Sequence, residues 1–382
     1  MFAVLVSSSL LLSEVLPAGP SAELTVEIQQ AQALLEEGQA AEATVRFGRL
    51  RKTPGLTGRE RATVQSNLAI AQMQSGRLAE AETSFAEAHR LLSAGPADQR
   101  MWVALWNAEA MLARQKGRWA QARELHERVA EATRAGDPVL HGISLNNRAE
   151  LERTFGDAVA AEGYARRSLA ALDQRLPRTE RHRAAALHTL GLVLQETGRG
   201  EEGCAALAEA WRLRQALFGL GSRAAAMSQA ALGSSYIAQG EYQEAQRLLE
   251  SALPMLEQHL GPHHPEVAAV WNNLAQVAKL SGQMSDADPL YRKALGIWEK
   301  VYGKASREYG LGLANFGDFF LAQGKGPGAA KLYAEAERIL EEALGAAHPR
   351  TQAVRLRRTQ AQAARDHQTE GQTLRYGVRT IR

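Results

Sequence analysis

Apolar and small residues recur along this chain with the spacing of amphipathic helices, and glycines interrupt them at regular distances. In the second half of the chain, glycines stand 42 residues apart at Gly219, Gly261, Gly303 and Gly345. A further glycine lies midway in each interval, at Gly240, Gly282 and Gly324. Self-similarity at a fixed period of this length is typical of repeat architectures. The pattern predicts two helices in each unit, helix A before the middle glycine and helix B after it.

Each helix B begins with the same order of small and large side chains. After Gly282, Ala287 is followed by the large Tyr291 and then by Ala294. The same order, with substitutions, follows five earlier middle glycines, which are Gly38, Gly76, Gly117, Gly156 and Gly198. These five bring the number of units to eight. A glycine ends a helix in a left-handed conformation without steric cost. Because one helix pair cannot bury its apolar face alone, we expect the units to stack on one another.

A second row of small residues lies on helix A, twelve positions before the first small residue of helix B. It comprises Ala69, Gly191, Gly233, Ala275 and Gly317. Two facing small residues predict a close approach of the two helix backbones within a unit.

The unit that starts at Gly261 carries the most specific motifs. Its segment LGPHHPEV (260–267) is followed by WNNLA (271–275) and LYRKAL (290–295), and AHPRT (347–351) repeats the opening motif. These motifs resemble the tetratricopeptide repeat, and more narrowly the 42-residue variety of kinesin light chains and many bacterial proteins. The resemblance covers residues 23–350. It implies an all-α fold, a right-handed superhelix (α-solenoid) of about eight helix-turn-helix repeats with a C-terminal capping helix.

The register divides the chain into an N-terminal segment, eight repeat units and a C-terminal segment. The units are expected at residues 23–54, 55–94, 95–135, 136–176, 177–218, 219–260, 261–302 and 303–348. Residues 349–382 are rich in Arg and Gln, and we interpret them as a capping helix with a polar outer face and a frayed tail, as a solenoid end requires. A basic tail for acidic partners is the alternative.

Residues 1–22 contain an apolar run, FAVLVSSSLLLSEVL, followed by small residues. The run is too short for a membrane span, which needs about 20 apolar residues. It is similar to the apolar region of a secretory signal, although no Lys or Arg precedes it. We expect an exported or periplasmic protein slightly more than a cytoplasmic one, with a frayed N-terminal helix as the alternative.

Composition argues against several classes of function. A single cysteine excludes a disulfide scaffold, and a net charge of +3 from 45 basic and 42 acidic residues is not a nucleic-acid footprint. No phosphate-binding loop, dinucleotide fingerprint or nucleophile elbow is complete. The only histidine cluster, His259, His263 and His264, falls in an inter-unit loop. We therefore expect no catalytic residues, no metal and no cofactor.

The resemblance implies that the helices A line a concave binding face, and asparagines are concentrated on these helices. The set comprises Asn67, Asn107, Asn146, Asn147, Asn272, Asn273 and Asn315, with His188 at the corresponding place in a weaker unit. Positive charge follows seven residues later at Arg114, Arg153 and Lys279. Asparagine is a poor mid-helix residue, and its amide both donates and accepts hydrogen bonds. A row of such amides suits the backbone of an extended peptide, whereas the plainer interpretation is a solvated helix surface.

These observations predict a non-enzymatic scaffold that holds an extended segment of a partner protein in the groove. One alternative is the sensing or regulatory part of a signalling system with a separate effector. A nucleic-acid-binding helical repeat is a weaker alternative, because neither the period nor the charge balance suits it. Self-association through an uncapped end of the stack also stays open.

Overall fold

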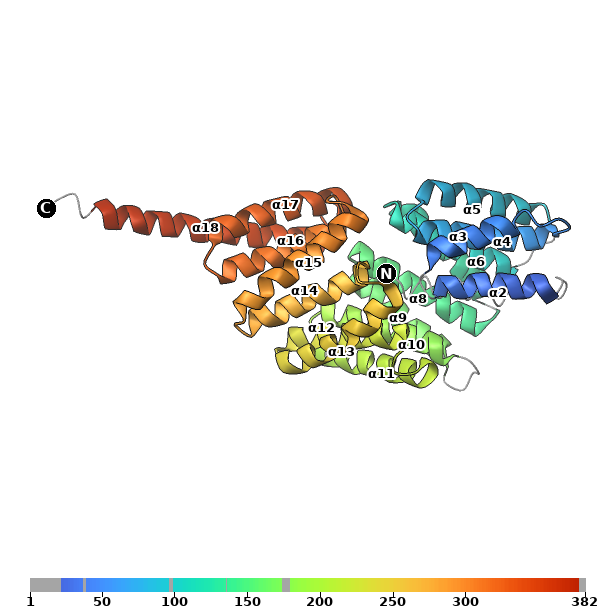
Figure 1. Cartoon of the computed structure of the whole chain (residues 1–382), viewed down its shortest axis with the longest axis horizontal. Helices are drawn as coiled ribbons and strands as arrows, with labels where there is room; N and C mark the ends of the chain where they lie inside the picture. Colours follow the sequence, from blue (N-terminus) through green and yellow to red (C-terminus); the bar gives the residue numbers. More distant parts are fainter. Residues whose placement is uncertain (1–21, 37–38, 96–98, 135, 174–178, 378–382) are drawn as a thin grey trace. The chain divides into compact units, whose positions relative to one another are not determined.

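The computed structural model of the chain describes residues 22–36, 39–95, 99–134, 136–173 and 179–377. These residues form α-helices joined by turns, with no strand among them (Figure 1). The expected all-α repeat solenoid with a C-terminal capping helix is thereby confirmed. The candidate export segment lies outside the described residues except for Ala22, and so do Gly38 and the last five residues of the tail.

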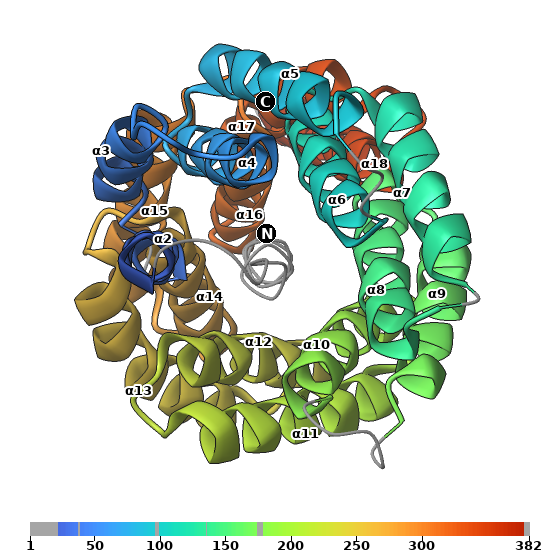
Figure 2. The ribbon, with the colours of Figure 1, turned by 90° about the vertical axis from the view of Figure 1, so that its right-hand side faces the viewer.

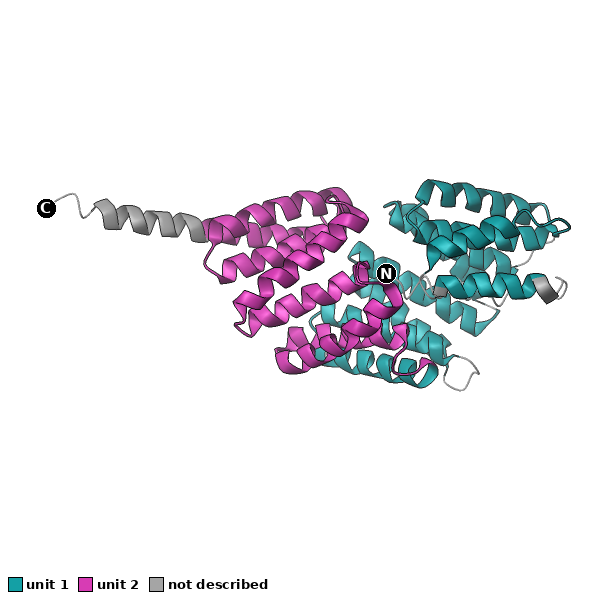
Figure 3. Ribbon diagram, viewed as in Figure 1, with its two compact units in different colours: residues 1–217 teal, residues 218–382 magenta. Residues whose placement is uncertain are grey.

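The chain divides into two compact units, residues 1–217 and 218–382 (Figure 3). The helices of unit 1 are α2 (Ala22–Glu36), α3 (Ala40–Leu50), α4 (Gly58–Gln74), α5 (Leu78–Ser93), α6 (Gln99–Gln115), α7 (Trp119–Thr133), α8 (Pro138–Phe155), α9 (Ala158–Ala171), α10 (Glu180–Glu196) and α11 (Gly200–Phe218). Those of unit 2 are α12 (Arg223–Gln239), α13 (Tyr242–Leu260), α14 (Pro265–Leu280), α15 (Met284–Tyr302), α16 (Arg307–Ala322), α17 (Gly326–Leu344) and α18 (Pro349–Gly377). Even-numbered helices up to α16 correspond to helix A, and odd-numbered helices to helix B.

Within unit 1 the two kinds of helix form two layers. In Figure 2, α4, α6 and α8 lie on the inner side of the unit's curve, and α5, α7 and α9 lie on the outer side. The helices A from α2 to α8 each pack on the helix B that follows and on the next helix A. The helices A of this unit therefore share one continuous surface.

The middle glycines end helix A as expected. Gly156 follows α8 with φ 98° and Gly240 follows α12 with φ 82°, a left-handed conformation that costs side-chain-bearing residues more than it costs glycine. In unit 2 the ends of helix B are equally regular. Helices α13, α15 and α17 each have 19 residues and end at Gly261, Gly303 and Gly345, with φ between 79° and 92°.

Facing small residues bring helices A and B together, which confirms the predicted close approach. A Cβ added at Gly191 on α10 would lie 2.9 Å from the carbonyl oxygen of Gly203 on α11. In unit 2, a Cβ at Gly317 on α16 would lie 2.7 Å from the ring of Tyr333 on α17. Both distances are shorter than real Cβ contacts, so a larger residue at either position would force its neighbour to shift.

The large residues of helix B fill the core between successive repeats within each unit. Phe47, Phe85, Leu249, Tyr291 and Tyr333 are at most 2% exposed. The alanines in the register before them are fully buried, so the composition rich in Ala and poor in aromatics reflects close packing of helices. Helix α18 covers the last repeat with Val354 and Ala361, which are buried. None of the helices in the described part of the chain is long and apolar enough to cross a membrane.

Candidate functional site

All seven asparagines of the chain lie on helices A. In unit 1 they occupy α4, α6 and α8, and in unit 2 they occupy α14 and α16. Five of them are at most 5% exposed, and Asn273 and Asn315 are half-buried. This burial is unusual for asparagine, which is mostly exposed in folded proteins. The side chains therefore do not simply decorate a solvated surface.

In unit 1 the amides bridge neighbouring repeats. Asn147 Nδ2 on α8 donates to Asn107 Oδ1 on α6 at 3.1 Å. Toward the N-terminus, Gln32 Nε2 on α2 donates to Asn67 Oδ1 on α4 at 3.4 Å. Asn67 Nδ2 donates in turn to the Thr63 carbonyl of its own helix at 3.0 Å. Amide-to-amide hydrogen bonds thus join successive helices A, a role that the asparagine register alone did not predict.

The Asn107–Asn147 pair leaves two buried polar atoms unused. Asn107 Nδ2 and Asn147 Oδ1 have no hydrogen-bond partner among the described residues, and neither has the adjacent Asn146 Oδ1. Turning both amides over would exchange the bonded atoms but again leave one donor and one acceptor. Buried polar groups without a partner are rare because each costs free energy. This pair therefore has unused capacity for one donor and one acceptor.

In unit 2 the same arrangement recurs on α14 and α16. Asn315 Nδ2 donates to Asn272 Oδ1 at 3.2 Å, and Asn272 Nδ2 lies 3.5 Å from Asn273 Oδ1. The three predicted residues of this unit are therefore brought together in one short chain of amides. Asn273 and Asn315, at its two ends, are the half-buried members.

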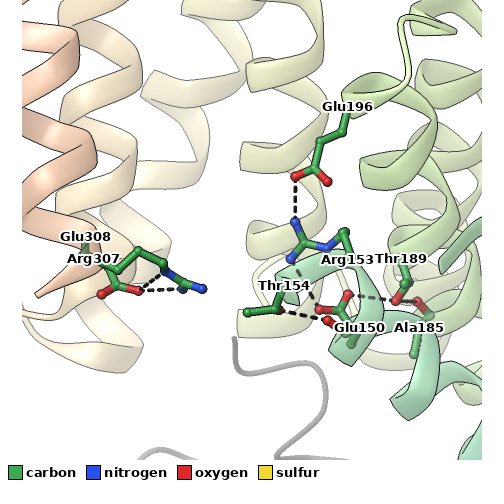
Figure 4. A network of polar contacts seen from close by, with 8 residues as sticks. All are labelled: Glu150, Arg153, Thr154, Ala185, Thr189, Glu196, Arg307 and Glu308. Carbon is green, nitrogen blue, oxygen red and sulfur yellow. Dashed lines mark hydrogen bonds and ion pairs between the residues drawn. The ribbon is translucent and has the colours of Figure 1, made fainter. Parts of the chain in front are cut away.

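The predicted cation Arg153 is already paired. It donates to Glu196 Oε1 at 2.9 Å and to Glu150 Oε2 at 3.3 Å, while Thr189 Oγ1 donates to Glu150 Oε1 at 3.0 Å (Figure 4). Burial raises the pKa of Glu150, but Arg153 and other positive charges outweigh burial and hold this pKa below its usual value. Burial lowers the pKa of Arg153, and its two carboxylate partners more than offset this effect. Arg153 therefore organises α8 and α10 rather than offering a free charge.

The other predicted polar residues differ in their surroundings. His188 on α10 is buried, its Nδ1 has no partner among the described residues, and burial lowers its pKa well below the usual value, so its ring is neutral at pH 7. Arg114 on α6 is 9% exposed. Lys279 on α14 is half-buried and forms no hydrogen bond or ion pair within the described part of unit 2. Burial lowers the pKa of Lys279, and Asp318 opposes this shift. Lys279, unlike Arg153, therefore has no carboxylate partner among the described residues and could pair with an acidic group of a ligand.

Sequence reasoning missed a second buried charge on α8. Glu152 is 2% exposed and accepts hydrogen bonds from Arg148 Nε at 2.7 Å and Arg123 Nε at 3.0 Å. Arg148 also donates to the Arg123 carbonyl at 2.9 Å, which ties α8 to α7. The available signal was spacing. Arg148 and Glu152 stand four residues apart and so share one face of α8.

The histidine cluster has a structural role. His264 Nδ1 accepts from the Glu266 amide at 3.1 Å and so caps α14, where Pro265 is the first residue. His259 Nε2 lies 2.8 Å from the Gly221 carbonyl. In the described parts of the chain, no group of three or more His, Cys, Asp or Glu side chains is placed to hold a metal ion.

Comparison with known families agrees with this register of paired helices. A family model described as tetratricopeptide repeat matches residues 182–258, 232–300 and 266–346 in successive overlapping stretches. Residues 182–346 of the chain are tetratricopeptide repeats. The matched stretches cover helices α10 to α17, and the same glycine register and helix pairs precede them in α2 to α9.

Among similar proteins, this chain is 35% identical over 75 residues to Protein KINESIN LIGHT CHAIN-RELATED 3 of Arabidopsis thaliana. That match covers 20% of the chain and 12% of the relative, so the chain spans only a small part of the relative's length. A Rap protein solved with Competence and Sporulation Factor has a TM-score of 0.55 at 12% identity, covering 89% of this chain and 100% of that one.

A third similar protein has a tetratricopeptide repeat sensor. It is the signal transduction ATPase PH0952 of Pyrococcus horikoshii, with a TM-score of 0.51 at 18% identity over 76% of this chain and 43% of that one. At such low identities both solved structures show a shared fold and nothing more.

Proposed function

We propose that this protein is a non-enzymatic scaffold that binds an extended segment of a partner protein along its helices A. Stacked repeats of this kind present extended surfaces to other proteins. The observation that carries the proposal is the recurrence of hydrogen-bonded asparagines on helices A, which in unit 2 ends at the half-buried Asn273 and Asn315. A peptide backbone presents one N–H donor and one C=O acceptor per residue, which is the complement of an asparagine amide. Recognition through the backbone would tolerate many side chains in the partner.

The amide chain of unit 2 extends this proposal to α14 and α16. Its half-buried ends, Asn273 and Asn315, are the positions where an added backbone would continue the chain of hydrogen bonds. Lys279 lies on the same helix as Asn273 and makes no ion pair with the described residues. An acidic side chain of the bound segment would neutralise it. The proposed segment therefore carries its acidic residue near the position that contacts Asn273.

The test compares peptide capture by three forms of the protein on an array of extended peptides. We expect the unit 2 variant Asn272→Ala/Asn273→Ala/Asn315→Ala and the unit 1 variant Asn107→Ala/Asn147→Ala each to lose about tenfold or more of their affinity, since each removes several hydrogen bonds of about 1 kcal/mol. Both members of the unit 1 pair are replaced, so no orphaned amide is left within it.

The control for these variants removes an amide elsewhere. Gln246 on the helix B α13 is half-buried and donates to Glu250 on the same helix at 2.8 Å, so Gln246→Ala should capture peptides as the wild type does. Undiminished capture by the asparagine variants, with circular dichroism unchanged, would reject helices A as the binding surface.

A sensing component with a separate effector is the second candidate. The Rap protein and the Pyrococcus protein share this fold, and their descriptions name a bound factor and a sensor. Hydrogen exchange distinguishes the two candidates. A scaffold gains protection only in the repeats that contact the peptide, whereas a sensor also changes protection in repeats remote from it.

A further inference from the structure

A pocket of about 330 Å³ lies on unit 1 among α5, α6 and α7, away from the asparagines. It is bounded by two helices B and by the helix A between them. Its apolar lining comes from Phe85, Leu112 and Leu125, which are at most 8% exposed and belong to three different helices. The pocket therefore combines a fixed apolar surface with an opening bordered by charged side chains.

Most of the charged groups around this pocket already have partners. Glu82 on α5 is paired with Lys116 and with Arg118, whose Nη1 lies 2.6 Å from Glu82 Oε1. Glu124 on α7 is paired with Arg128 at 2.7 Å. These pairs largely cancel within the lining, so they do not determine which charge a ligand should carry.

Glu109 is the exception. It reaches the pocket from α6 and forms no hydrogen bond or ion pair with the described residues. A carboxylate that is withdrawn from water without a partner is costly, and a cation with hydrogen-bond donors is its natural complement. The other titratable groups that line the pocket are Glu82 and His89 on α5, Arg118 just before α7, and Glu124 and Arg128 on α7.

We propose that this pocket binds a short hydrocarbon chain that ends in a cation, with the hydrocarbon on Phe85, Leu112 and Leu125 and the cation on Glu109. Lysine and arginine side chains have this chemistry, and so do free alkyl diamines. A cavity of about 330 Å³ accommodates one such group rather than a folded element. This site is on a different surface from the one proposed for the extended peptide, and it is independent of that proposal.

The protonation of Glu109 makes binding dependent on pH. Burial raises the pKa of Glu109 to about 7, although Arg128 opposes the shift. At pH 6 most Glu109 side chains are therefore neutral, and at pH 8 most are charged. Because the cation binds the charged form, affinity should increase about tenfold from pH 6 to pH 8. At pH 7 binding should release about half a proton per site.

The binding experiment measures the affinity of the full chain for n-butylammonium by NMR titration and calorimetry. We expect binding to strengthen from pH 6 to pH 8, and Glu109→Gln to weaken it about tenfold and to abolish its pH dependence. Glu87→Gln, which alters a paired carboxylate on α5 outside the pocket lining, should change it little. Absence of binding at pH 8, or equal binding by Glu109→Gln and wild type, would overturn the proposal.

Two further probes distinguish the sources of the cation. A lysine with both backbone ends capped represents a protein side chain, and 1,5-diaminopentane represents a free amine. Tighter binding of the capped lysine would assign the pocket to a protein side chain, and tighter binding of the diamine to a small molecule. Either preference supports the proposal, and binding of neutral n-butanol as tight as that of n-butylammonium would contradict it.

Two steric variants test the location of the site. Ala86 lines the pocket and is exposed, so Ala86→Phe should fill the cavity without disturbing the core. Thr83 is exposed on the same helix but does not line the pocket, so Thr83→Phe is the matched control. We expect only Ala86→Phe to block n-butylammonium, and equal binding by both variants would place the site elsewhere.

Thermal unfolding provides a readout without any ligand. A carboxyl group whose pKa is higher in the folded than in the unfolded chain destabilises the fold at pH values above its unfolded pKa. The reason is that the folded state resists its ionisation. Glu109→Gln should therefore raise the melting temperature at pH 8 and change it little at pH 4. A melting temperature lowered equally at both pH values would show that Glu109 has a structural partner and would contradict the proposed free carboxylate.

Discussion

Replacing Glu152 by alanine is expected to destabilise unit 1 by about 3 kcal/mol, because two arginines lose their buried carboxylate partner. Glu152 on α8 is 2% exposed and receives hydrogen bonds from Arg148 and Arg123. The Arg148 side chain is 15% exposed and Arg123 35%, so water can compensate the second guanidinium better than the first. The expected loss therefore lies at the low end of the range for broken buried pairs.

The measurement is hydrogen exchange of the α7 and α8 amides, supported by urea unfolding of the full chain. Local exchange is preferable because a long repeat array does not unfold as a single two-state system. Glu124→Ala is the matched control, since Glu124 pairs with Arg128 and both side chains are more than half exposed. Such surface pairs contribute about 0–1 kcal/mol. Equal effects of the two substitutions would show that the Glu152 network does not stabilise the α7–α8 contact.

Replacing Gly191 by alanine is expected to destabilise the α10–α11 pair by about 1–3 kcal/mol, as overpacking does elsewhere. The new Cβ would lie 2.6 Å from Leu207 Cγ and 2.9 Å from the Gly203 carbonyl oxygen. Leu207 can rotate, but the carbonyl belongs to the backbone of α11, so the two helices must separate. The higher helix propensity of alanine, worth about 1 kcal/mol, does not compensate for this overlap.

Gly163 on α9 provides the opposite case within the same unit. A Cβ there meets no atom within 4 Å, so Gly163→Ala should stabilise its helix by about 0.5–1 kcal/mol. Circular dichroism during urea unfolding compares the two variants. If Gly191→Ala stabilised the protein as Gly163→Ala does, the close approach of α10 and α11 would be disproved.

Most of the fold followed from the glycine register. The middle glycines, the small residues on facing helices and the large residue on helix B each have one steric role, and sequence spacing places them in a repeat without knowledge of tertiary structure. The contact of Gly191 with Gly203 was predictable in this way. The division into eight repeats remains our interpretation of that register.

The site was predictable only in part. The recurrence of asparagine on helices A identified the residues, but hydrogen bonding between Asn107 and Asn147 depends on the distance between neighbouring helices, which spacing does not supply. The same limit applies to Arg153. It occupies the expected helix, yet its partner Glu196 lies 43 residues away on α10. Glu109 was not predicted, because it stands without a partner only when Glu82 and Glu124 pair with nearby cations in the folded chain.

The equal lengths of α13, α15 and α17 have a consequence for how such a chain changes over generations. Each of these helices has 19 residues and ends at a glycine, so each small residue keeps its facing partner when one whole period is duplicated or lost. A gain of a few residues inside a helix would instead rotate every later side chain off its contact. Inherited changes of length in this half of the molecule should therefore come in steps of one period, and variants of intermediate length should be selected against.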